Sequence, residues 1–108
     1  MPIVNLTPHV LNIQAGDGAF LVLKPESTPP ARVACNSVFA HRFLGIDMVK
    51  TTYGEIENLP DPKYGITYVV SGMVLAALKG TRPDVCSPGE LIRDDAGKPI
   101  GCKGLRVS

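Results

Sequence analysis

The chain lacks most of the features that point directly to a function. Its 108 residues include no tryptophan, two histidines and three cysteines. No apolar run reaches the ~18 residues of a membrane-spanning helix, and no charged N-terminal segment precedes an apolar one as in a secretion signal. An odd number of cysteines without such a signal predicts reduced thiols, which are most often small buried apolar residues. We therefore expect a protein of the cytoplasm.

Charge and motifs exclude further classes of function. The chain has 11 basic and 10 acidic residues, so its formal net charge is +1. Broad binding of nucleic acid would need a basic excess, and a nucleic-acid mimic would need an acidic one. The sequence contains no G-x-G-x-x-G, GK[ST], H-E-x-x-H or G-x-S-x-G motif, and its cysteines and histidines match no zinc spacing. We therefore assign no catalytic residue, metal or cofactor, which favours a protein that is not an enzyme.

Glycine and proline, by contrast, are plentiful. The 11 glycines and 10 prolines are spread along the chain, with short apolar runs between them. This pattern is typical of many short strands joined by turns. The apolar fraction of 44% predicts a folded chain, and the length fits a single domain over residues 1–108.

Three segments give the clearest strand patterns. The run "ITYVVS" (66–71) is β-branched and aromatic, which predicts a central strand buried on both faces. Residues 9–24 predict a hairpin that turns at "AGDG", and residues 90–107 predict a last hairpin that turns at "DAGK". In that last hairpin, Gly101 and Gly104 indicate bulges or close approach of another backbone.

The middle of the chain is less regular. Residues 31–35 predict a strand, and residues 36–45 fit either a strand or a short helix. Residues 46–59 predict a strand with a break near Gly54. Residues 81–89 are expected to form a loop containing at most one short strand.

The segment "SGMVLAALKG" (71–80) predicts the single helix. Ser71 can cap its N-terminus and Gly80 can end it. The residues expected to share its buried face are Met73, Val74, Ala77 and Leu78. Together with six to eight short strands, this helix predicts a mainly β or α+β domain, built as a small antiparallel sheet or a partly open barrel.

A polar turn lies near the start of the chain, in "NLTPHV". Pro8 fixes a bend, and Asn5, Thr7 and His9 follow one another at every second position. In extended backbone that spacing places an amide, a hydroxyl and an imidazole on one face, where they could contact a polar ligand. Alternatively, the turn satisfies its own backbone groups, and His9 is a partly buried strand residue.

Arginines mark two further candidate sites. Arg32 follows the proline-rich "STPP", and a guanidinium on a rigid loop suits phosphate or carboxylate. In "TRPDVCSPGELIRDDAG" (81–97), arginines could bind an anion while aspartates bind sugar hydroxyls. Both segments could instead form internal ion pairs, and the tyrosines at 53, 64 and 68 could stack on a base or belong to the core. The candidate ligand-binding residues are Asn5, Thr7, His9, Arg32, Arg82, Asp84, Arg93 and Asp94.

Four stretches resemble a family of small proteins of tailed phages and prophages that open with N-L-T-P-H. They are "NLTPHVLNI", "ARV", "TTYGEIENLPDPKYGITYVVSGMV" and "RPDVCSPGELIRDDAGKPIGCKGL". The resemblance covers roughly residues 3–105 and departs at "ESTPPARV", where the family usually has P-S-G. The matching polar positions are Asn5, Thr7, His9, Arg32, Glu55, Ser71, Arg82, Asp84, Arg93 and Asp94.

The resemblance implies a phage setting, and a small phage protein without a catalytic motif suggests interference with a host system. We expect a counter-defence sponge that binds a small nucleotide-like immune signal without cleaving it, in the cytoplasm of the host cell. The arginines would bind phosphates, and the remaining candidates would read sugar and base. A small β domain often builds such a pocket between subunits, so we expect a homo-oligomer.

Two alternatives remain open at this point, besides a virion or assembly accessory protein. The protein could be an inhibitor of the anti-CRISPR type, which binds a protein of a host defence complex through an exposed patch and needs no pocket. It could also be a nucleotide-processing enzyme with His9 as general base and Asp84 or Asp94 as its partner.

Overall fold

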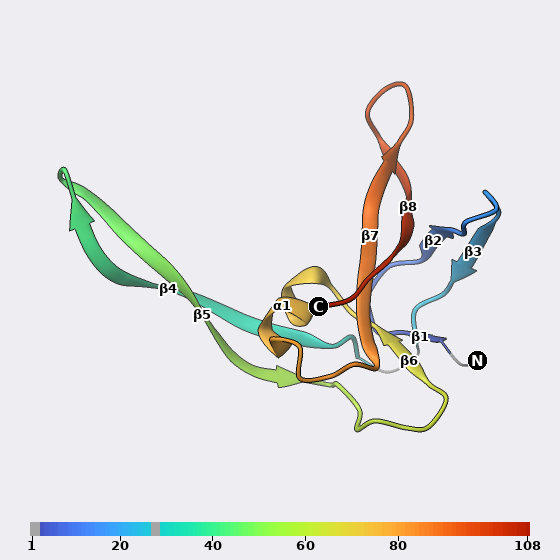
Figure 1. The fold of residues 1–108 in the computed structure, drawn as a ribbon, viewed down its shortest axis with the longest axis horizontal. Helices are drawn as coiled ribbons and strands as arrows, with labels where there is room; N and C mark the ends of the chain where they lie inside the picture. Colours follow the sequence, from blue (N-terminus) through green and yellow to red (C-terminus); the bar gives the residue numbers. More distant parts are fainter. Residues whose placement is uncertain (1–2, 27–28) are drawn as a thin grey trace.

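The computed structural model describes residues 3–26 and 29–108, which form eight strands and one helix (Figure 1). This confirms the predicted class, mostly strands with one short helix. The helix, α1, spans Gly72–Leu78. The strands are β1 (Ile3–Asn5), β2 (Leu11–Gln14), β3 (Phe20–Leu23), β4 (Arg32–Phe43), β5 (Ile46–Glu57), β6 (Thr67–Val69), β7 (Val85–Arg93) and β8 (Pro99–Arg106).

Six strands form the body as one nearly closed, barrel-like sheet in the order β1-β6-β7-β8-β2-β3. The pairs β2–β3 and β7–β8 are antiparallel, as expected for the hairpins predicted over 9–24 and 90–107. The pairs β1–β6, β6–β7 and β2–β8 are parallel. The sheet of the body is therefore mixed.

The parallel pairs join segments that are distant in sequence or separated by the helix. Strands β6 and β7 are joined through α1, which provides the crossover that a parallel pair requires. Strands β1 and β2 pair with β6 and β8, both of which lie in the second half of the chain. A periodic pattern within one segment predicts a hairpin but carries no signal for such distant pairings.

Strand β6 lies between both hydrophobic clusters of the body. Tyr68 and Val70 belong to one cluster, which the buried face of α1 covers, and Val69 belongs to the other. All three side chains are at most 3% exposed. The predicted burial on both faces is therefore confirmed for Tyr68–Val70, while the strand itself is shorter than 66–71 and Ser71 is exposed at the start of α1.

The cysteines divide between these clusters and the surface. Cys86 and Cys102 are buried in the second cluster, as the expectation of small buried thiols requires, and burial raises the pKa of the Cys86 thiol. Cys35 is also a free thiol but is exposed on β4, so that expectation is wrong for this residue.

The helix forms where the sequence predicts it, but its buried face is rotated. The Ser71 hydroxyl accepts from the Val74 amide, and the chain leaves the helix through Lys79 and Gly80, both with positive φ. Leu75 is buried, whereas Met73, expected in the core, is 53% exposed. The cluster around β6 takes up the neighbouring residues Val74, Leu75 and Leu78, and this leaves the position of Met73 facing outward.

The prediction of a loop over residues 81–89 is wrong for its second half. Strand β7 begins at Val85 and continues through Pro88 and Gly89. Strand β6 pairs only with Val85 and Cys86, so no neighbour on that edge needs the amide proton that Pro88 lacks. Gly89 runs so close to β8 that an added Cβ would overlap the carbonyl oxygen of Lys103.

Gly101 shows the close backbone approach that the sequence indicates. A Cβ at this position would lie 2.7 Å from the carbonyl oxygen of Asn12 on β2. Gly104 has a φ of 60°, which favours glycine. Gly89 and Gly101 therefore fix how closely β8 packs on its neighbours, whereas Gly104 is favoured by its positive φ alone, with no atom within 4 Å of an added Cβ.

Strands β4 and β5 pair with each other as a separate two-stranded sheet, which projects from the body as a long arm (Figure 1). Residues 36–45 are thus strand up to a turn at Leu44 and Gly45, not a helix. The break expected near Gly54 is an irregularity in register opposite Val33 and Cys35, and β5 continues past it to Glu57.

Because Gly89 packs directly against β8, we predict that Gly89→Ala lowers the free energy of unfolding by about 1–3 kcal/mol. Gly16→Ala is the matched control, since no atom lies within 4 Å of a Cβ at Gly16, and its effect should stay within about 0.5 kcal/mol. Urea unfolding followed by circular dichroism measures both. Equal midpoints for the two variants would contradict the close approach of β7 and β8.

Candidate functional site

The polar turn after β1 is closed on itself. The Asn5 side chain is 2% exposed, and its amide donates to the carbonyl oxygens of His9 (2.8 Å) and Leu23 (3.0 Å). Its Oδ1 accepts from both the amide and the hydroxyl of Thr7, at 2.9 and 2.7 Å. These four bonds fill the hydrogen-bonding capacity of the amide, so Asn5 fastens β1 and the turn to the end of β3.

Asn5, Thr7 and His9 are therefore brought together as predicted, but in an arrangement that satisfies the chain itself. His9 contributes its backbone, while the residue is exposed and lines a groove on another face of the body. This matches the alternative interpretation of an internally bonded turn, but His9 is exposed and lies in a bend between β1 and β2, so its expected place as a partly buried strand residue is wrong.

Arg82 and Asp84 form the most enclosed ion pair among the described residues. Two nitrogens of Arg82 donate to the two oxygens of Asp84 at 2.9 and 2.8 Å, and Nη2 also donates to the carbonyl oxygen of Pro60. Both side chains are 17% exposed. The hydrogen bond from Arg82 lowers the pKa of Asp84, and the same bond raises the pKa of Arg82. The pair ties the loop after β5 to the start of β7.

The other candidates also have partners within the chain. Arg32 pairs with Glu57 at 2.8 Å, across the base of the arm, with both side chains well exposed. Arg93 donates to the carbonyl oxygen of Gly97 in the turn between β7 and β8. Asp94 accepts from the amides of Ala96 and Lys98 in that same turn.

The three arginines thus occupy separate parts of the fold: the base of the arm, the loop before β7 and the far end of β7. The structure does not gather them around one cavity, and each guanidinium has a partner in the chain. Binding of a ligand by the eight predicted residues stays a prediction.

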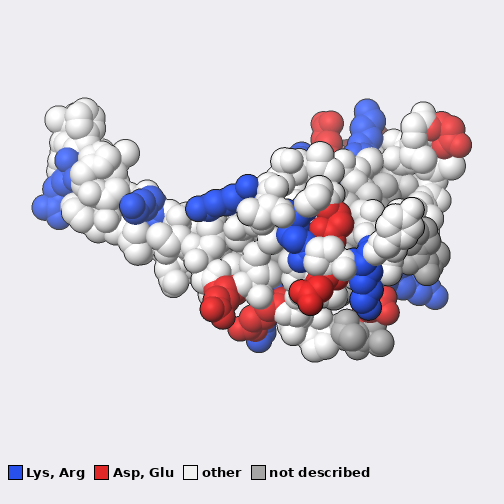
Figure 2. Space-filling model, turned by 60° about the horizontal axis from the view of Figure 1, so that its bottom comes forward, with Lys and Arg blue, Asp and Glu red and all other residues white. Residues whose placement is uncertain are grey.

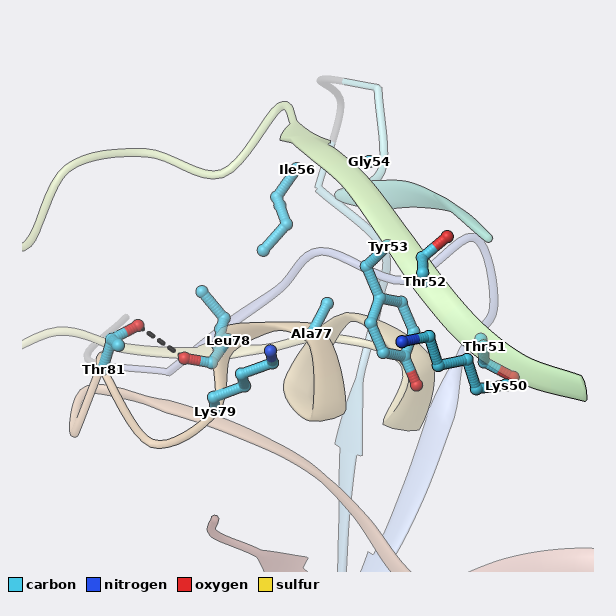
Figure 3. Close-up of a pocket in the computed structure, with 10 residues that line it drawn as sticks. All are labelled: Lys50, Thr51, Thr52, Tyr53, Gly54, Ile56, Ala77, Leu78, Lys79 and Thr81. Carbon is cyan, nitrogen blue, oxygen red and sulfur yellow. Dashed lines mark hydrogen bonds between the residues drawn. The ribbon is translucent and has the colours of Figure 1, made fainter. Parts of the chain in front are cut away.

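A cleft of about 700 Å³ lies elsewhere, where the inner part of β5 faces the C-terminal end of α1 (Figure 3). Tyr53 points from β5 toward the helix near Ala77, Lys50 crosses in front of the Tyr53 ring in this view, and Lys79 extends from the helix end toward the same space. The described residues that line it are Lys50, Thr51, Thr52, Tyr53, Gly54, Ile56, Ala77, Leu78, Lys79 and Thr81.

The lining of this cleft is cationic and rich in hydroxyl groups. Among the ten described lining residues are two lysines, three threonines and a tyrosine, but no aspartate or glutamate. In Figure 2, basic groups follow the arm, whereas acidic groups gather below the place where the arm meets the body. Ile56, Ala77 and Leu78 add an apolar part to the lining.

The helix end would oppose an anion if its last carbonyl groups were left open. Here two of these carbonyl groups have donors. The Thr81 hydroxyl donates to the Leu78 carbonyl oxygen at 2.7 Å, and the Lys79 backbone amide donates to the Ala76 carbonyl oxygen. Lys79 itself adds a positive charge at this end. The local field of the cleft is therefore set mainly by its ammonium groups.

The sequence indicated only part of this cleft. Tyr53 was a candidate for stacking on a base, but Lys50 and Lys79 were not predicted. The run "KTTY" in the middle of β5 was the available signal, because it joins a lysine, two threonines and a tyrosine in one short segment. Its meaning depends on α1 packing against the arm, which the sequence does not show.

Comparisons with known proteins give no relative from which a site could be transferred: no family model matches the chain, and no curated protein or solved structure matches it. Within residues 3–26 and 29–108, no helix has the length and hydropathy to cross a bilayer, and no cluster of three or more histidine, cysteine, aspartate or glutamate side chains is placed to hold a metal ion. The cleft is therefore interpreted from its own chemistry.

We predict that Asp84→Asn destabilises the fold by about 1.5–3 kcal/mol at pH 7, because it removes the partner of a largely buried guanidinium. The pKa of Asp84 is lowered on folding, so this carboxylate stabilises the fold above its unfolded pKa of about 4 and loses that effect as the pH falls through the folded value.

The difference between the wild type and Asp84→Asn should consequently shrink below about pH 4. Urea unfolding at pH 7 and pH 3 measures it. Glu57→Gln, which alters the exposed pair with Arg32, is the control and should change stability by less than about 1 kcal/mol at either pH. A difference that is independent of pH would contradict the assigned role of the carboxylate.

Proposed function

We propose that the protein binds a small anionic ligand of nucleotide type in the cleft between β5 and α1 and sequesters it unchanged. The observation that carries this proposal is the convergence of Lys50 and Lys79, from two separate elements, on a space that no described carboxylate lines. The protein would act as a phage counter-defence sponge, and this setting is supported by the sequence resemblance alone.

The cleft lysines are better candidates for binding an anion than the predicted arginines, because the charges of the lysines are not used in ion pairs with any described residue. The ion pairs among the described residues are Arg32–Glu57, Arg42–Asp47 and Arg82–Asp84, and neither cleft lysine belongs to one. Lysine binds phosphate as a point charge, so an ammonium group on each wall suits a ligand with one or more phosphates.

The neutral lining residues suit the rest of a nucleotide. The ring of Tyr53 could stack on a base, an interaction worth about 1–3 kcal/mol per base in other proteins. Thr51, Thr52 and Thr81 add hydroxyl groups to the lining, although that of Thr81 already donates to the Leu78 carbonyl oxygen. The volume of about 700 Å³ lies within the range of roughly 300–1,000 Å³ that is usual for small-molecule sites.

Sequestration is favoured over conversion by what lines the cleft. The described lining contains no histidine, cysteine, aspartate or glutamate, the side chains that most often transfer protons or attack a substrate. His9, the general base in the enzyme alternative, lines a different groove. A sponge must meet its signal where that signal diffuses, so we place its action in the host cytoplasm, as a homo-oligomer.

The alternative of a protein-binding inhibitor rests on a different observation. The outer part of the arm exposes several large apolar side chains, which could contact a protein of a host defence complex. That mode of action would not require the cleft lysines.

We predict that a panel of nucleotides, cyclic dinucleotides and ADP-ribose contains a ligand that raises the thermal midpoint by several degrees at 100 times its Kd, a stabilisation of about 2.7 kcal/mol. Lys50→Ala and Lys79→Ala should each weaken its Kd about tenfold, the equivalent of one charged hydrogen bond. Lys98→Ala, in the turn between β7 and β8, is the matched control and should bind like the wild type.

Tyr53 separates stacking from hydrogen bonding in the same assay. Tyr53→Phe should keep most of the affinity, whereas Tyr53→Ala should lose about tenfold or more. Mass spectrometry of ligand released by heat should return it unchanged. A flat panel would overturn the proposal, and a chemically altered ligand would favour the enzyme alternative.

A further inference from the structure

The outer part of the arm exposes apolar side chains that nothing in the described chain covers. We call residues 39–49 the arm tip, and every one of them is exposed. Figure 1 shows the tip far from the body, with α1 packed only near the arm's other end. The large apolar residues of the tip are 41–83% exposed: Phe39, Phe43, Leu44, Ile46, Met48 and Val49.

The turn at the arm tip is also unfavourable for the isolated chain. Leu44 has a φ of 51° and Gly45 a φ of 77°, and two-residue hairpin turns with positive φ at both positions favour Asn-Gly. A leucine in left-handed conformation is disfavoured, and this one is 83% exposed. Neither property stabilises the isolated chain, and a two-stranded hairpin is marginal in water by itself.

The body carries a concave apolar surface of matching character. A groove of about 630 Å³ lies between residues 9–12 and strands β7 and β8. Val10, Leu91 and Ile100 line it and are 47–54% exposed, together with Pro88 and Pro99. The arm points away from β2 and β8, so a chain cannot reach this groove with its own tip (Figure 1).

We propose that two copies of this chain exchange arms, so that the arm tip of each lies in the groove of the other. The occupant is a second copy because one chain carries both an exposed apolar tip and an exposed apolar groove, at positions that cannot meet within the monomer.

The area of these surfaces also favours two reciprocal contacts. An aromatic side chain buries 150–250 Å² in full, so residues about 60% exposed offer on the order of 100 Å² each. The six large apolar residues of one tip and the three of one groove would together bury roughly 900 Å², which is below the ~1,000 Å² of a stable interface. Two such contacts related by a twofold axis would bury about twice that area. Each strand of the arm has 12 residues and is therefore about 40 Å long, which is enough to span a neighbouring body.

This inference rests on the apolar surfaces and does not depend on a ligand in the cleft. Analytical ultracentrifugation measures the mass of the particle in solution, and we choose protein concentrations over roughly two decades, about 1 to 100 µM. We expect a particle of twice the chain mass of 11.5 kDa. Leu44→Asn and Ile100→Ser should each raise the dimer Kd at least tenfold. Val107→Ser, at a residue 71% exposed and outside both surfaces, is the control and should not change it.

Leu44→Asn is a sharp test because asparagine fits the turn better than leucine, so circular dichroism should show an intact fold. A second measurement identifies the contact itself. In a Cys35→Ser background, Leu44→Cys and Ile100→Cys chains are mixed under mild oxidation, and peptide mass spectrometry should find the 44–100 disulfide between chains.

Three results would overturn the proposal. They are a monomer over the whole concentration range, a dimer indifferent to both the tip and the groove variants, and a 44–44 disulfide in place of the 44–100 one. A monomer whose tip binds a host protein instead would support the inhibitor alternative. These outcomes are independent of the ligand panel, so failure of the exchange and failure of the sponge can be distinguished.

Discussion

Strand β6 is buried on both of its faces, and the hydrophobic clusters of the body form on either side of it. Its three residues pair in parallel with β1 on one edge, and two of them, Tyr68 and Val69, pair in parallel with β7 on the other. The cluster containing Tyr68 and Val70 places α1, and the cluster containing Val69 places β2, β3 and β8. Because α1 is placed in this way, its C-terminal end faces the inner part of β5 and forms one wall of the cleft. The position of the candidate site therefore depends on the packing of one short apolar strand.

The sequence predicts those parts of the fold whose causes are local. The hairpins over 9–24 and 90–107, the helix after Ser71 and the burial of "ITYVVS" all follow from turn residues, capping and apolar runs. The parallel pairs, the passage of β7 through Pro88 and the rotation of the helix face at Met73 do not. Each of them depends on which distant strand lies alongside, and the pattern within a segment carries no information about that neighbour.

The same distinction explains the candidate site. Asn5, Arg82 and Asp94 stand out in the sequence as polar groups in turns, and in the structure they hydrogen-bond the chain's own turns and loops. Lys50 and Lys79 look like ordinary surface lysines in the sequence. They acquire a common environment only when β5 and α1 come together. The conspicuous polar residues are used by the fold, whereas the lysines that we propose for the ligand are inconspicuous in the sequence.

Strand β5 runs without interruption from the wall of the cleft to the outer end of the arm. A strand that is held at one end has less freedom at the other, so events at its two ends share one conformational cost. If occupancy at one end changes the affinity at the other, thermodynamic linkage requires the reverse change to have the same factor. The arm is then a mechanical connection as well as a surface, and the affinity measured for a small molecule would vary with the concentration of the protein itself.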